Sequence, residues 1–408
     1  MPSGSYDTIR CSARISGVAI MKIWRGSLLL VLFWVMQIEV FAQPDQLAGD
    51  KEEQTKIAEQ LEIYVDQYDY QEIDETLKDL FPEERIEFKN TLLGVVSGDI
   101  TFSVELLKRL GKEQILYALV KSRKNLIHIL MLAIMAAVFT NFARAFGNHQ
   151  VADTGFYMLY LLVTVLCLNS AQIVMNWIEE GIENLTRFMT VFCPIYFPAV
   201  AVAKGSVTAV SYYSLTLFLV YLVEMLLQYL ILPAIHIYIL TGMMNYLTKE
   251  AYLSKLVEFI KTILIWIMKT ILAGIVGLNL IQGLLGPAID TVKRSALTKG
   301  AEAIPGIGDA VGSVTEVIFA SAILVKNGIG IIGAILCFAL CMLPMIQIGV
   351  IVIIYKLAAA VVQPISDERI VGCIDIVGEG MQLLLRTVFT TGLLFLITII
   401  LVAATTGT

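Results

Sequence analysis

Three ionisable side chains lie inside long apolar runs of this 408-residue chain: Glu224, His236 and Lys326. An ionisable group at membrane depth costs about 2.5–3.5 kcal/mol on insertion scales, so it usually faces a cavity or a partner charge. We treat the three as candidate pore or interhelical polar residues. For Glu224 the alternative is a helix end that reaches water. The other cations of these runs are expected to place their charge at the membrane interface: Lys204, Lys261, Lys269, Lys356 and Arg386.

Known catalytic motifs find no support in the sequence. Gly328–Gly333 matches the dinucleotide pattern G-x-G-x-x-G, but that pattern works only between a strand and a helix with an acid about 20 residues further on. Here it opens an apolar run, and we interpret it as close helix packing by small residues. His128, His149 and His236 lie too far apart for H-E-x-x-H, and the cysteines lack zinc or disulfide spacing. We therefore expect no enzyme, no cofactor and no metal.

Composition places these residues in a membrane protein. Hydrophobic residues make up 57% of the chain and charged residues 16%, where soluble domains carry roughly 25% charged residues. Residues 43–124 hold 29 charged side chains in 82 positions, whereas residues 125–408 hold 29 in 284. The sequence thus predicts an acidic polar domain followed by a multi-span membrane domain. The negative excess of the first part makes nucleic acid a poor partner.

The amino terminus carries a secretory signal. Lys22 and Arg25 precede an apolar stretch, and Val40-Phe41-Ala42 supplies a cleavage site with a small residue at its end. Residues 21–42 are therefore a signal peptide or an uncleaved signal anchor, and residues 1–20 are interpreted as a start-site extension. Either form places residues 43–124 outside the cytoplasm, although the basic residues 121–124 beside the first span favour the opposite orientation.

The acidic domain is predicted to be a small helical unit. Ile57, Leu61, Tyr64 and Tyr68 share one helix face, Pro82 begins a second helix, and a third follows Ser103. Its burial capacity is modest, so we expect it to pack on the membrane domain or on a partner.

The predicted fold class is all-α: a polytopic membrane protein with about seven to nine spans. A helix needs about 20 apolar residues to cross a bilayer. Prolines suggest that some spans are broken or re-entrant. Residues 177–187 suggest an interfacial helix, and residues 367–379 could form another. The spans are expected near residues 126–146, 155–175, 188–203, 207–230, 232–247, 259–284, 328–343, 345–363 and 383–404.

A short repeated pattern and a glycine-rich stretch add candidate motifs. The pattern L-P-x-I-x-I occurs around Pro233 and around Pro344, either as the trace of a duplicated, broken-helix core or by chance in Ile- and Leu-rich sequence. Residues 286–333 suit a re-entrant hairpin or a shaped loop, with an ordinary exposed connection as the alternative. The motif residues of this stretch are Pro305, Gly306, Gly308, Asn327 and Gly328.

In this layout the chain resembles the stage III sporulation protein AE family of endospore-forming Firmicutes. The resemblance rests on signal, acidic domain and multi-span half, and on residues 304–306, 324–328, 343–344 and 360–364. It implies a multi-pass protein of the mother-cell membrane around the forespore. With other stage III sporulation membrane proteins of the same operon and a forespore-side partner, it would form a secretion-like channel complex. The alternative function is a permease-like small-solute transporter.

Overall fold

The computed structural model describes part of the chain, and every regular element in that part is a helix. All the described residues belong to one compact unit, residues 57–408. Residues 1–20, the signal segment 21–42 and the stripe that begins at Ile57 lie outside them. The described residues are 70–80, 87–96, 149–204, 206–247, 252–301 and 308–405, with isolated positions between 112 and 138.

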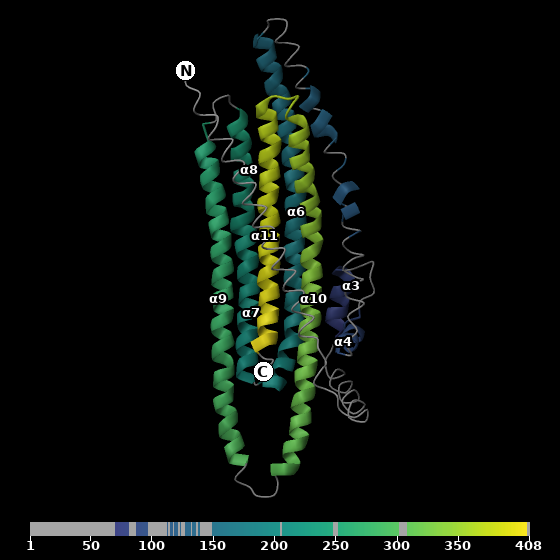
Figure 1. The fold of residues 1–408 in the computed structure, drawn as a ribbon, viewed down its shortest axis with the longest axis vertical. Helices are drawn as coiled ribbons and strands as arrows, with labels where there is room; N and C mark the ends of the chain where they lie inside the picture. Colours follow the sequence, from purple (N-terminus) through teal and green to yellow (C-terminus); the bar gives the residue numbers. More distant parts are fainter. Residues whose placement is uncertain are drawn as a thin grey trace. The chain divides into compact units, whose positions relative to one another are not determined.

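Long helical rods lie side by side in this unit (Figure 1). Six residues or fewer separate each rod from the next, and such short connections join antiparallel neighbours. The rods are α6 (His149–Lys204), α7 (Ser206–Leu226) continued by the π-helical turn η1 (Leu227–Ile231) and α8 (Leu232–Leu247), α9 (Ser254–Ala301), α10 (Gly308–Val362), and α11 (Glu368–Thr405).

Helix α11 forms the centre of the bundle and contacts α6, α7, α8, α9 and α10. Glycines let it approach α8 closely: a methyl group at Gly380 would overlap Ile239, and one at Gly242 on α8 would overlap Ile376. Small residues at helix contacts are typical of membrane bundles, where lipid removes the hydrophobic force between helices and packing must replace it.

Five helices in the described residues are long and apolar enough to cross a membrane, fewer than the seven to nine expected. The excess arose because three pairs of predicted spans each form one continuous rod. Residues 155–175 and 188–203 both belong to α6, and the other two pairs belong to the α7–α8 rod and to α10. The predicted span at 126–146 is described only at isolated helical positions. The five candidates are Thr154–Val202, Ala209–Leu247, Ser254–Ile281, Val325–Val362 and Glu368–Ala403.

The prolines do not interrupt these rods. Pro194 and Pro198 lie inside α6, and Pro344 lies inside α10. Pro233 follows η1, where the Leu232 amide donates to the Leu227 carbonyl five residues back. A π-helical turn absorbs an irregularity of this kind without ending a helix. The prediction of broken or re-entrant helices at Pro233 and Pro344 was therefore wrong, because the helical backbone continues through both. Pro233 follows a π-helical turn, whereas Pro344 lies inside an α-helix, so the two prolines differ in local backbone conformation.

The stretch 286–333 is also more regular than expected. Helix α9 continues to Ala301 and α10 begins at Gly308, so residues 302–307 alone separate two helices. Gly308, Asn327 and Gly328 are helical. The predicted loop or hairpin across the whole stretch is therefore corrected to two helix ends, and Pro305 and Gly306 lie outside the described residues.

Two short helices of the acidic segment pack on the bundle: α3 (Gln71–Leu80) on α6, and α4 (Phe88–Val96) on α10. Their apolar side chains join the common core, as Ile73, Leu77 and Phe88 show. Asp74 ties the two helices together by accepting a 2.7 Å hydrogen bond from the Phe88 amide. This agrees with the expectation that the segment packs on the membrane domain.

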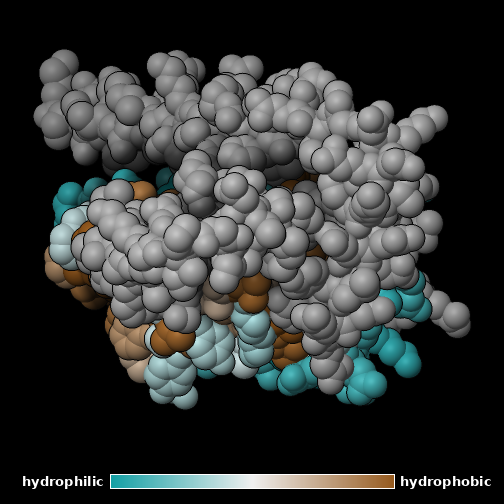
Figure 2. Space-filling view, turned by 90° about the horizontal axis from the view of Figure 1, so that it is seen from below, coloured by the Kyte–Doolittle hydropathy of each residue, from teal (hydrophilic) through white to brown (hydrophobic). Residues whose placement is uncertain are grey.

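Many large hydrophobic side chains reach the surface of the bundle. Among them are Tyr229 and Ile237 on the α7–α8 rod and Trp266 on α9. Figure 2 views the molecule from below and shows hydrophobic and hydrophilic residues next to each other on the surface of the described part. An apolar outer surface is expected where lipid replaces water as the solvent.

Candidate functional site: a polar layer inside the bundle

Two ion pairs lie close together in the bundle, and both use carboxylates of α11. Glu379 Oε2 accepts from Lys261 Nζ of α9 at 2.8 Å and from the Tyr238 hydroxyl of α8 at 2.7 Å. Asp375 Oδ1 accepts from Lys356 Nζ of α10 at 2.6 Å. We call these five residues the ion-pair layer. It links α8, α9, α10 and α11 at a single level of the bundle.

The spacing of the two acids explains this arrangement. Asp375 and Glu379 are four residues apart, so the helix places both on one face. Two lysines from neighbouring helices balance the two carboxylates, and all four charged side chains are partly buried. Opposite charges that meet at membrane depth avoid the cost of isolated ones. The positive and negative charges of the ion-pair layer therefore balance each other.

A further charge lies at the start of α11. Arg369 is buried, and its Nε donates to Asp367 Oδ1 at 3.0 Å. Its guanidinium lies 3.5 Å from the ring centroid of Phe156 on α6, a cation–π contact. Residues 367–379, which the sequence suggested as another interfacial helix, are thus the mostly buried first turns of α11 and its lead-in.

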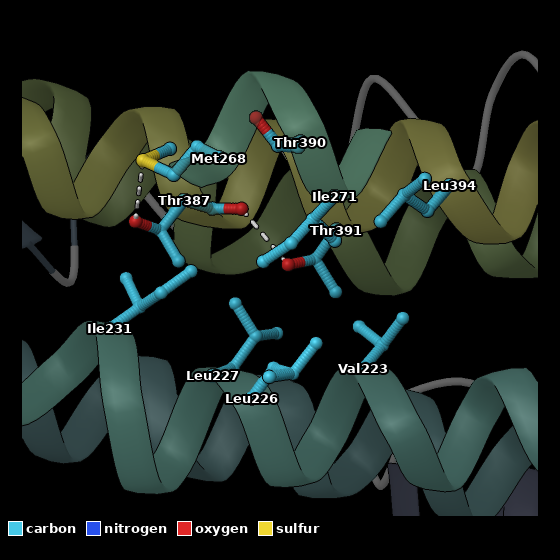
Figure 3. Close-up of a pocket in the computed structure, with 10 residues that line it drawn as sticks. All are labelled: Val223, Leu226, Leu227, Ile231, Met268, Ile271, Thr387, Thr390, Thr391 and Leu394. Carbon is cyan, nitrogen blue, oxygen red and sulfur yellow. Dashed lines mark hydrogen bonds between the residues drawn. The ribbon is translucent and has the colours of Figure 1, made fainter. Parts of the chain in front are cut away.

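A small cavity lies between η1, α9 and α11 (Figure 3). Threonines of α11 form one wall: the Thr387 hydroxyl contacts the Met268 sulfur at 3.7 Å, and the Thr391 hydroxyl donates to the Thr387 carbonyl. Leu227 and Ile231 of η1 form the opposite wall. Its volume of about 10 Å³ suits about one water molecule, so it holds no solute.

The structure does not bring Glu224, His236 and Lys326 together. Glu224 is half-buried on α7, where Glu183 of α6 is close enough for the two carboxylates to repel each other. His236 Nδ1 lies 3.3 Å from the Met175 sulfur. Lys326 is fully buried, and its Nζ donates to the Ala403 carbonyl near the end of α11 at 3.4 Å. Each residue joins a different pair of helices.

The glycines of the G-x-G-x-x-G pattern pack as the sequence predicted. Gly330 lies against Tyr196 of α6, and a methyl group at Gly333 would overlap the ring of Phe192. Stacked aromatic side chains of α6 thus fill the space that these glycines leave. Their role is close contact between α6 and α10.

Sequence reasoning missed the ion-pair layer. Lys261 and Lys356 were assigned to the interface as isolated cations, and Asp375 and Glu379 to an interfacial helix. One signal was available: two acids at a spacing of four inside a run that is otherwise apolar. The pattern does not reveal which lysines they meet, because those lie on other helices.

The described residues contain no group of three His, Cys, Asp or Glu side chains that would hold a metal ion. The five cysteines in this part are all buried and free: Cys167, Cys193, Cys337, Cys341 and Cys373. What the geometry offers is a set of interhelical contacts and a neutralised polar layer.

An all-helical bundle with apolar rods of this length defines a polytopic α-helical membrane protein. Residues 86–406 match the family described as stage III sporulation protein AE, and the chain belongs to that family. Stage III sporulation protein AE of Bacillus subtilis (strain 168) is 23% identical over 321 residues, which cover 78% of this chain and 80% of that protein. No solved structure matches the chain.

Proposed function

We propose that the protein is a membrane subunit of a secretion-like channel complex that links mother cell and forespore. It would lie in the mother-cell membrane around the forespore, beside other stage III sporulation membrane proteins and a forespore-side partner. Membership of a sporulation family supports the cellular context. The observation that carries the subunit role is the pairing of apolar outer surfaces with inner charges that neutralise each other.

This arrangement favours an assembly role over an enzyme. Every member of the ion-pair layer already has its partner within the bundle, so the layer offers no free nucleophile or base. The cavity beside η1 is also too small for a substrate. Exposed apolar side chains along several rods instead suit contact with lipid and with other membrane helices.

Affinity purification from sporulating cells tests the proposal. A tagged copy is extracted in mild detergent at the stage of engulfment, and its companions are identified by mass spectrometry. We expect membrane proteins of the same operon to co-purify at fixed ratios. An unrelated multi-pass protein with the same tag, expressed at the same stage, is the control. Recovery of the tagged chain alone, from cells in which it supports sporulation, would falsify the proposal.

Glu224→Ala separates this function from that of a solute permease. A channel subunit keeps its partners and most of its activity when one half-buried carboxylate is removed. A permease with a central acidic site loses transport while the complex stays intact.

We also propose that residues 43–124 lie outside the cytoplasm, as the signal at 21–42 indicates. Protease added to intact protoplasts should cut this segment along with a known exterior control. If it is cut only after the cells are opened, the segment lies inside.

A further inference from the structure

Helix α6 carries an exposed polar face in the middle of its candidate span. Its members recur every three or four residues, so they share one side of the helix. From first to last they extend over about 33 Å at 1.5 Å per residue, close to the roughly 30 Å hydrocarbon thickness of a bilayer. We call this face the polar stripe, and it consists of Asn169, Gln172, Asn176, Glu179, Glu180, Glu183, Arg187 and Thr190, all exposed.

The stripe lies at the depth of apolar surfaces elsewhere in the bundle. Met175, beside it in sequence, contacts His236 of α8, and the next residue there, Ile237, is 54% exposed. Gly181 of α6 faces the Pro344 ring of α10, and α10 has no charged residue between Lys326 and Lys356. Lipid can surround these apolar neighbours, but it cannot solvate three exposed glutamates.

The stripe has no cation of its own that balances its acids. Its single arginine, Arg187, is engaged by Asp79 of α3 at 2.9 Å. No ion pair joins Glu179, Glu180 or Glu183 to a cation in the described part of the chain. These carboxylates therefore need water.

A second helix carries charge beside the stripe. Helix α3 packs on α6 and turns its charged side outward, where Glu72, Glu75 and Lys78 are exposed. It comes from a distant part of the sequence, yet it adds polar surface near the end of the stripe that carries Arg187. Glu224 of α7 adds another acid close to Glu183. Charged side chains of α3 and α7 thus lie beside the stripe of α6.

We propose that the polar stripe of α6 lines a water-filled passage through the membrane that admits cations and neutral polar solutes in preference to anions. The inference rests on the proposed channel complex, because other chains must close the passage on the sides that α6 and α3 leave open. Acidic linings concentrate cations and repel anions. The stripe holds three carboxylates against one arginine that is already paired.

Cysteine labelling in membrane vesicles that contain the intact complex tests the passage. Gln172→Cys, Asn176→Cys and Thr190→Cys place thiols along the stripe, and Ile237→Cys is the control of equal depth on the apolar flank. The parent chain, whose described cysteines are buried, gives the background. A membrane-impermeant methanethiosulfonate should label the stripe positions at least about tenfold faster than Ile237→Cys.

Reagents of opposite charge test the selectivity. After each rate is divided by the same reagent's rate with a small free thiol, a quaternary ammonium methanethiosulfonate should react with Thr190→Cys about tenfold faster than its sulfonate counterpart, within the range that charged clefts produce. Replacing Glu179, Glu180 and Glu183 with Gln should remove most of this preference. If the corrected rate of the cationic reagent at Thr190→Cys does not exceed that of the anionic reagent while the three glutamates are intact, the proposed selectivity is overturned.

Co-purification of the complex, measured on the same membranes, separates the two proposals. Stripe thiols that stay unlabelled in an intact complex overturn the passage alone, because a protein partner then covers the stripe. Equal labelling of Ile237→Cys also overturns it, because that whole level of the bundle then lies in water. A complex that fails to co-purify overturns the proposed function, whatever the labelling shows.

Discussion

The ion-pair layer and the polar stripe are two charged regions of one bundle, and they handle charge in opposite ways. In the layer, each carboxylate of α11 meets a lysine from another helix. In the stripe, glutamates of α6 face outward and meet no cation within the described residues. Charges that are paired inside a bundle fix which helices meet. Charges that are left unpaired at membrane depth indicate water, and therefore a function beyond the fold.

Breaking the layer should have the largest effect. Glu379→Ala leaves Lys261 without its counter-charge and the Tyr238 hydroxyl without its acceptor. Loss of one partner of a fully buried pair costs about 3–5 kcal/mol, and partial exposure here places the expected loss at the lower end, about 3 kcal/mol. Thermal unfolding of the purified protein in detergent measures it. The charge exchange Lys261→Glu with Glu379→Lys should recover much of the loss, and a wild-type melting temperature for Glu379→Ala would remove the layer's structural role.

Gly380→Ala tests the packing that brings α8 against α11 beside the layer. The added methyl overlaps Ile239, and overpacking of this kind costs about 1–3 kcal/mol. Gly274→Ala on α9 is the matched control, since its methyl meets no neighbouring atom and should gain about 0.5–1 kcal/mol of helix preference. Unfolding in detergent should shift in opposite directions for the two variants. Equal shifts would mean that close contact is unimportant at this position.

Neutralising the stripe should leave stability almost unchanged. Glu179→Gln, Glu180→Gln and Glu183→Gln alter exposed side chains with no ion-pair partner in the described part of the chain, so each should change the free energy of unfolding by less than about 0.5 kcal/mol. The same unfolding assay applies. A loss as large as that of Glu379→Ala would show that the stripe is structural, and the contrast between the two regions would disappear.

The smallest effect is expected at Asp74, a carboxyl outside the spans. Burial raises the pKa of Asp74, and the nearby Glu87 charge adds to this, although the Phe88 amide opposes it. The folded state therefore binds this proton more tightly than the unfolded chain does. Its contribution to stability is fully present below the unfolded pKa and is lost as pH rises through the folded one.

Asp74→Asn keeps an oxygen that accepts from Phe88 and removes this pH dependence. Limited proteolysis of the α3–α4 segment should show slightly greater resistance than wild type at neutral pH and no difference at acidic pH. Greater susceptibility at neutral pH would show that the charged form stabilises the contact.

The class of the fold could be predicted from the sequence, but the number of spans could not. Apolar run lengths identified every region that became a rod. Pro233 and Pro344 suggested extra ends, because proline usually stops a helix in water, and the charged stretch 177–187 separated the two spans predicted within α6. In the bundle, η1 and the neighbouring helices accommodate these residues, and three pairs of predicted spans became three rods.

The candidate site, too, could be predicted only in part from the sequence. Glu224, His236 and Lys326 were visible because a charge stands out in an apolar run, yet each joins a different pair of helices. Close helix packing at Gly330 and Gly333 was predicted correctly, since small residues on one face of a helix indicate close approach, but the partner helix was not predicted. The ion-pair layer was not predicted, because an acid and a lysine that are 118 residues apart in sequence form a pair only once α9 lies against α11.

The sequence by itself determined that the chain enters lipid, that it folds as helices and that it belongs with sporulation membrane proteins. The first two conclusions depend on hydrophobicity and on local order along the chain, and the third depends on the resemblance of its motifs to a known family; none needs knowledge of neighbouring helices. The tertiary structure alone decided which charges are neutralised and which stay exposed on α6. That distinction depends on distances between helices, because a charge at membrane depth is stabilised only by what packs beside it.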